Sequence, residues 1–113
     1  MTGPLRGSLL DASSAPERGE RVRELARVRN AVVEQILSGE LERPVDYCQD
    51  QDELVVVLAG AAVLDVAGER VELGAGDWLL LPARTPHRLV RTEPGTSWLA
   101  VHVHPGGGPR PGE

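Results

Sequence analysis

The residues of this chain best suited to chemistry are one glutamate and three histidines. Glu53 begins "ELVVVLAG", in which the acid is followed by an apolar run typical of a buried strand. His87 follows a Thr-Pro dipeptide, and His102 and His104 lie in the C-terminal run "WLAVHVH". Carboxylate and imidazole groups can exchange protons with a bound molecule or hold a divalent metal ion. Glu53 is either a solvated acid in the turn before its strand or a side chain that points into a cavity.

Short strands are expected to position these residues. From about residue 30 onward the hydrophobic period is two, and turn-forming residues recur about every ten positions, as at Gly60 and Ala67-Gly68. Regular short strands with this spacing predict an all-β sandwich or barrel. Upstream, Val22, Leu25 and Val28 recur at helical spacing, which predicts a short helix at about residues 20–28.

Two stretches, "ELVVVLAG" and "LGAGDWLLLPARTPHRL", together with the final "WLAVHV", resemble a small single-domain cupin of the cupin-2-like kind. The first cupin motif ends in Glu, six residues and Gly, and Glu53 and Gly60 match that spacing. The second motif places Gly, Pro and His at spacings matched by Gly76, Pro82 and His87. The resemblance covers roughly residues 30–104. It implies a cupin-like jelly-roll β-barrel, and we expect the short helix to precede it.

The first motif is degenerate in this chain. The family typically binds a divalent metal through three histidines and one glutamate, and only Glu53 and His87 stand at matching positions. The His-x-His pair is replaced by Tyr47 and Gln49 when a three-residue gap is counted. With a four-residue gap, the replaced positions are Asp46 and Cys48.

Another histidine could complete a metal site. Side chains on one strand face recur every second residue, so Trp98 and His102 share a face. If that face lines the barrel, His102 enters the cavity with Glu53 and His87. Two imidazoles and one carboxylate suit Fe, Mn, Ni or Zn as divalent ions. Without a metal, Glu53 and His87 form a candidate catalytic acid–base pair that could move a proton on a bound sugar or keto acid.

Four further residues are expected to contact a small-molecule ligand. Tyr47 and Gln49 share with Glu53 the parity that the cupin family uses for inward positions, so the resemblance implies that they point inward. Arg91, placed inside the barrel, could pair with Glu53 or bind a substrate carboxylate. Trp98 could form a wall of the pocket.

Length and composition bound the remaining classes. The 113 residues predict one domain at 16–105, between a flexible N-terminal arm at 1–15 and a flexible tail at 106–113. The net charge of −5 and the absence of a basic cluster argue against nucleic acid as a partner. No apolar run approaches the ~20 residues that span a bilayer, and no signal peptide is evident, so no membrane partner and a cytoplasmic location are expected.

Three functional hypotheses follow. The first is a cupin that binds a divalent metal and a small molecule inside the barrel, with isomerase and dioxygenase chemistry both open. The second is a metal-free small-ligand binding or sensor module. The third is a structural dimerisation domain with a filled barrel. Several strands, such as "LVVVL", are apolar on both faces, which predicts a homodimer under all three.

Overall fold

The computed structural model describes residues 3–106 of the chain. A single 3-10 turn, η1 (Ala12–Ser14), precedes nine strands in this part. The strands are β1 (Glu20–Val28), β2 (Ala31–Ser38), β3 (Val45–Tyr47), β4 (Asp52–Ala59), β5 (Ala61–Val66), β6 (Glu69–Gly74), β7 (Trp78–Leu81), β8 (His87–Thr92) and β9 (Thr96–Val103). No helix in this part of the chain is long and apolar enough to cross a membrane.

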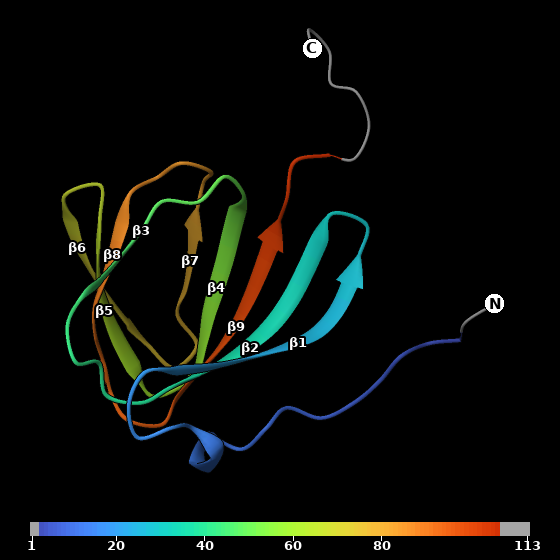
Figure 1. Cartoon of the computed structure of the whole chain (residues 1–113), viewed down its shortest axis with the longest axis horizontal. Helices are drawn as coiled ribbons and strands as arrows, with labels where there is room; N and C mark the ends of the chain where they lie inside the picture. The colour runs from blue at the N-terminus through green and yellow to red at the C-terminus, as the bar shows by residue number, and fades with distance from the viewer. Residues whose placement is uncertain (1–2, 107–113) are drawn as a thin grey trace, which may run out of the picture.

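The strands form two antiparallel sheets that face each other (Figure 1). The larger sheet has the order β1-β2-β9-β4-β7, and the smaller has the order β3-β8-β5-β6. Strand β9 is therefore the middle strand of the larger sheet, paired with β2 on one side and β4 on the other. This arrangement confirms the expected all-β jelly-roll barrel.

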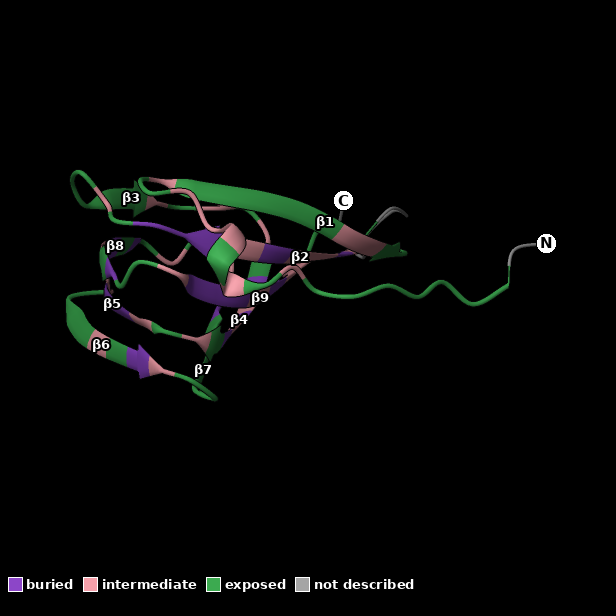
Figure 2. Ribbon diagram, turned by 90° about the horizontal axis from the view of Figure 1, so that it is seen from below, coloured by how far each residue is buried: buried purple, intermediate pink, exposed green. Residues whose placement is uncertain are grey.

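The core lies between the two sheets. Its buried cluster comes mainly from the inward positions of β4, β5 and β9, where Val, Leu, Ala and Trp alternate with outward residues. Figure 2 shows β9 as largely buried and the edge strand β1 as largely exposed. Four residues of this cluster, Val55, Leu64, Leu89 and Trp98, also line the pocket described below.

The expected helix at residues 20–28 is wrong, because these residues form β1. The strand pairs with β2 along its length, from Glu20 opposite Ser38 to Val28 opposite Ala31. A bulge between Glu24 and Ala26 shifts the register and moves the following side chains to the other sheet face. The helix-like spacing of apolar residues is thus produced by a bulged strand, and sheet pairing outweighs weak helix propensity.

The outer face of the larger sheet is apolar. Directly paired residues on neighbouring strands share a face, so one row runs across β2, β9, β4 and β7 through Val33, Val101, Leu54 and Leu80. Trp78 ends the adjacent row and is 66% exposed. We call this surface the outer apolar face.

Part of the N-terminal arm covers one margin of the larger sheet. The backbone N–H of Leu10 donates to Gln35 Oε1, and Gln35 Nε2 donates to the Leu10 carbonyl, both at 2.8 Å. Gln35 is fully buried as a result. Leu5 is 85% exposed, so the arm covers the sheet only near its end at η1. The expected C-terminal tail lies, apart from Gly106, outside the described residues.

Candidate functional site

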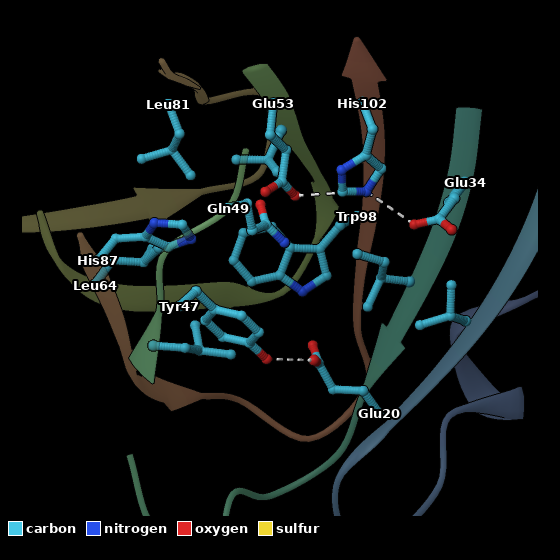
Figure 3. A pocket seen from close by; sticks show the side chains of 14 residues that line it. Glu20, Glu34, Tyr47, Gln49, Glu53, Leu64, Leu81, His87, Trp98 and His102 are labelled. Carbon is cyan, nitrogen blue, oxygen red and sulfur yellow. Dashed lines mark hydrogen bonds and ion pairs between the residues drawn. The ribbon is translucent and has the colours of Figure 1, made fainter. Parts of the chain in front are cut away.

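A pocket of about 220 Å³ opens between the two sheets (Figure 3). Apolar side chains from both sheets form much of its wall, including Val55, Leu64, Leu81, Leu89 and Trp98. The polar side chains are concentrated on the larger sheet and on β3 and β8. They include Glu34, Tyr47, Gln49, Glu53, His87 and His102.

Glu53 and His102 are brought together by strand register. They are directly opposed on β4 and β9, and Glu53 Oε2 lies 3.9 Å from His102 Nε2. Glu34 on β2 is the diagonal neighbour of His102 across the β2–β9 ladder. Its Oε1 lies 2.9 Å from His102 Nε2. The imidazole of His102 therefore stands between two carboxylates from the strands on either side.

Both ring nitrogens of His102 have neighbours. Gln51 Nε2 lies 3.3 Å from His102 Nδ1. A carboxylate can only accept, so His102 Nε2 donates its proton to Glu34. These two contacts hold the orientation of the imidazole ring.

Glu53 has a different environment. It is 7% exposed, and no residue in the described part of the chain donates a hydrogen bond to its carboxylate. Its oxygens are not sealed off, because the described chain contains no fully buried side-chain oxygen that lacks a partner. Burial raises the pKa of Glu53 above 4.5; the imidazoles of His102 and His87 oppose this shift, while Glu34 and Glu20 add to it. The carboxyl group is thus buried in the wall and reaches the pocket.

His87 faces the pocket from the opposite sheet. Its Nδ1 donates to the Thr85 carbonyl at 3.0 Å, because a carbonyl can only accept. Nε2 is left as the nitrogen that can interact with a pocket ligand. Tyr47 is directly opposed to His87 on β3 and β8, and their rings stack with centroids 5.4 Å apart. This stack holds the imidazole plane in place.

Tyr47 also approaches the larger sheet. Its hydroxyl lies 3.4 Å from Glu20 Oε1, and the other oxygen of Glu20 accepts from Ser38 at 2.8 Å. Burial raises the pKa of Tyr47, and the nearby charges of Glu20 and Glu53 raise it further. Tyr47 and Glu20 therefore connect the two sheets on one side of the pocket.

The structure places the expected ligand-binding residues as follows. Tyr47, Gln49 and Trp98 line the pocket, and the Trp98 indole N–H donates to Ser38 Oγ at 3.0 Å. The three-residue gap in the first motif is therefore the one whose positions face inward. Cys48, from the four-residue gap, is exposed.

The expected interior position of Arg91 is wrong. Arg91 is exposed and does not line the pocket. The pairing of β5 with β8 contains an irregularity: Val63 is opposite Arg91, but the next residue, Leu64, is opposite Leu89. This bulge reverses the parity that His87 and Leu89 establish, so Arg91 turns outward. In the described part of the chain Arg91 makes no ion pair with Glu53.

The donor set fits a resident metal poorly. No group of three His, Cys, Asp or Glu side chains between residues 3 and 106 converges closely enough to hold an ion. His102 uses Nε2 for Glu34 and Nδ1 for Gln51, so binding a metal would require breaking one of these contacts. The metal set of Glu53, His87 and His102 stays a prediction.

Sequence reasoning missed Glu34, Glu20 and Gln51. The signal for Glu34 was present, since it shares parity with Val32 and Ile36 on an otherwise apolar strand face. The signal for Glu20 was hidden by the helical interpretation of residues 20–28. The role of Gln51 depends on a loop geometry that no spacing rule supplies.

This fold and pocket are those of a small cupin, and comparisons with known proteins agree. The family model described as a cupin domain matches residues 32–102. The chain belongs to the cupin family.

Several solved structures share its fold. A Ralstonia eutropha protein described as a "putative mannose-6-phosphate isomerase" is 31% identical; the match covers 90% of this chain and 100% of that chain, with a TM-score of 0.76. KdgF from Halomonas sp. is 20% identical, covering 77% and 82% of the two chains, with a TM-score of 0.66. A cupin superfamily protein from Desulfitobacterium hafniense is 20% identical, covering 90% and 94%, with a TM-score of 0.68. No curated protein matches the chain in sequence.

Proposed function

We propose that the barrel pocket binds a small organic molecule and that Glu53 and His87 contact it. One observation carries this proposal: the Glu53 carboxylate is buried, has no hydrogen-bond donor among the described residues, and reaches a pocket. The Glu53 oxygens therefore remain open to a donor that enters the pocket. A charged acceptor that gains such a donor is stabilised by about 1.5–3 kcal/mol.

The same two residues support proton transfer. Glu53 lies on the larger sheet and His87 on the smaller, so a molecule between the sheets can touch a carboxyl group and an imidazole nitrogen together. One group can take a proton from the ligand while the other returns one, which is the requirement of an isomerase. The similar Ralstonia eutropha protein is described as an isomerase, which supports this class of reaction.

The binding proposal is tested with a panel of small polar metabolites and two readouts, thermal unfolding and calorimetry. A pocket ligand must raise the melting temperature, because anything that binds only the native state stabilises it. The effect must be lost in Glu53→Gln and kept in Glu72→Gln, a change at an exposed glutamate on β6. Stabilisation that is equal in both variants would place the ligand elsewhere and defeat the proposal.

Metal binding is the alternative that the family favours. Glu34, His102 and Glu53 already lie in one chain of contacts, so a rotation of His102 could present a nitrogen to an ion. Elemental analysis after loading with Fe, Mn, Ni or Zn decides between the two. About one ion per chain, lost in both His87→Ala and His102→Ala, would establish the metal site and replace the metal-free proposal.

We also propose a homodimer through the outer apolar face. Val33, Val101, Leu54 and Leu80 form a continuous row, and Trp78 stands exposed beside it. A sheet face of this kind is normally covered. A second copy of the chain is the simplest cover, since twofold symmetry places the same patch on both partners.

A further inference from the structure

We infer that the pocket selects a small organic cation, an amine with a short apolar body, over phosphorylated or carboxylated metabolites. This inference rests on the proposal that the pocket binds a small molecule at all. It adds the chemical class of that molecule, and it excludes the sugar phosphates that a mannose-6-phosphate isomerase would take.

The first support is the charge of the pocket wall. Three glutamates line it, from three different strands: Glu20 on β1, Glu34 on β2 and Glu53 on β4. No arginine in the described part of the chain lines the pocket, and the sequence contains no lysine. A phosphate or carboxylate held here would lack the cationic donors that normally bind such groups.

Three arginines close in sequence to pocket-lining residues point elsewhere. Arg23 lies on β1 and donates to the Ser8 carbonyl of the N-terminal arm at 3.0 Å. Arg88 lies beside His87 on β8 and makes a two-bond pair with Asp46 outside the pocket. Arg91 is turned outward by the β8 bulge.

The second support is that both imidazoles are already engaged by other groups. His102 donates from Nε2 to Glu34, and Gln51 lies against its other nitrogen. His87 donates from Nδ1 to a backbone carbonyl and offers Nε2 as an acceptor when neutral. The pocket therefore presents acceptors on both sheets, which suits a ligand with several N–H donors.

The third support is Glu53 itself. Glu20 accepts from Ser38 and Tyr47, and Glu34 accepts from His102, so both have partners. Glu53 is more than nine-tenths buried, and no described residue donates a hydrogen bond to it. An ammonium group beside Glu53 would supply both a donor and the missing positive charge, whereas a hydroxyl group would supply only the donor.

The remaining wall limits the body of the ligand. Val55, Leu64, Leu81 and Leu89 provide apolar contacts, and Trp98 adds an aromatic ring that can also attract a cation. The volume of about 220 Å³ is below that of a typical drug-binding pocket. The geometry thus fits an amine with a few carbon atoms.

A matched set of probes tests this inference by calorimetry and thermal unfolding of the full chain. Isoamylamine, isoamyl alcohol and isovalerate share one carbon skeleton and differ in a cationic, neutral or anionic head. Mannose, mannose 6-phosphate and Mg²⁺ complete the set. Isoamylamine is expected to bind more tightly than the alcohol by about tenfold or more, as a charge-assisted hydrogen bond predicts, with no binding of isovalerate or mannose 6-phosphate.

The Glu53→Gln variant keeps the side-chain shape and removes the charge. It should weaken the binding of isoamylamine by about tenfold or more and leave the affinity for isoamyl alcohol nearly unchanged. Glu34→Gln is a second variant, for which a smaller loss of the amine is expected because Glu34 is already paired. Glu72→Gln on the surface is the control and should change neither probe.

Failure of this inference can be told apart from failure of the proposed function. Glu53-dependent binding of mannose, isovalerate or mannose 6-phosphate with no preference for the amine would overturn the cation class and keep the ligand pocket. Glu53-dependent binding of Mg²⁺ without the amine would overturn it in favour of an inorganic ion. No Glu53-dependent binding of any probe would count against both proposals.

Discussion

Glu53 and His102 face each other across the β4–β9 ladder, and their side chains approach to 3.9 Å without forming a hydrogen bond. His102 instead donates to Glu34 at 2.9 Å on its other side. His102 thus donates a hydrogen bond to Glu34 only, and the Glu53 carboxylate faces the pocket without that bond.

Replacing Glu53 with Gln should stabilise the ligand-free protein at neutral pH. Burial raises the pKa of Glu53 in the folded chain above its ordinary 4.5, so ionisation opposes folding. The melting temperature of Glu53→Gln should exceed that of the parent chain by a few degrees at pH 7. The measurement is thermal unfolding of both proteins without ligand, with Glu72→Gln as the surface control.

The stability difference between Glu53→Gln and the parent chain should depend on pH. Folding stability attributable to Glu53 is full below about pH 4.5, where the acid is protonated in both states. It is lost as pH rises through the raised pKa of the folded state. The advantage of Glu53→Gln should therefore be smallest in acid and grow with pH to a plateau. An advantage that shrinks with rising pH would mean that Glu53 is stabilised as a carboxylate.

His102→Ala should be strongly destabilising, because it removes the donor to Glu34 and the partner of Gln51. The expected loss is about 1–3 kcal/mol of unfolding free energy, typical of removing a hydrogen bond to a charged group at a half-buried site. His104→Ala is a matched control, since His104 lies two residues further on and is exposed. Its expected effect is within about 0.5 kcal/mol. Urea unfolding measures both, and equal effects would show that the contacts of His102 add nothing.

Gly60→Ala should destabilise the fold more than Gly68→Ala. Both glycines have φ near +87°, at +88° and +86°, so a side chain is strained at either position. At Gly60 a Cβ would also lie 2.7 Å from Thr96 Cα and contact Thr96 Oγ1, whereas nothing lies within 4 Å at Gly68.

The strain alone should cost about 1 kcal/mol at both sites, and the overlap at Gly60 about 1–3 kcal/mol more. Urea unfolding of the two variants supplies the difference directly. A cost at Gly68 equal to that at Gly60 would show that backbone conformation, and not the close approach of Thr96, explains why glycine occupies this position.

Trp78→Arg should break the proposed homodimer and leave the barrel folded. Trp78 is 66% exposed on an edge strand and has no part in the pocket. Analytical ultracentrifugation at micromolar concentration should show a dimer for the parent chain and a monomer for the variant, with unchanged circular dichroism. Arg43→Ala, away from this face, is the control. A parent chain that sediments as a monomer of 12.1 kDa would exclude the dimer.

The barrel could be predicted from sequence because strand alternation and motif spacing are local properties. The cupin motif spacing predicts interior positions for Glu53 and His87, and strand parity adds His102 if the Trp98 face lines the barrel; all three line the pocket. The two differences have one physical origin. A bulge changes parity without changing composition, so β1 has the apolar spacing of a helix and Arg91 has the parity of an interior residue.

The partner of each site residue was harder to predict than its direction. His102 Nε2 lies 2.9 Å from Glu34 and 3.9 Å from Glu53, so Glu34 accepts its hydrogen bond. This difference depends on side-chain packing and on the Gln51 amide on the far side of the ring. Sequence spacing fixes which strand face a residue occupies. It does not fix which of two nearby carboxylates wins a hydrogen bond.

The two walls of the pocket differ in how firmly the sheets hold them, because β9 is the middle strand of the larger sheet. The backbone of His102 is held there by ladders on both sides, and displacing that backbone would require the sheet to open. The opposite wall carries Tyr47 on β3, a three-residue strand at the edge of the smaller sheet. Changes in β3 could therefore reshape the ligand side of the pocket while the Glu34–His102–Glu53 side stays unchanged, so new binding preferences could arise in this barrel at little cost in stability.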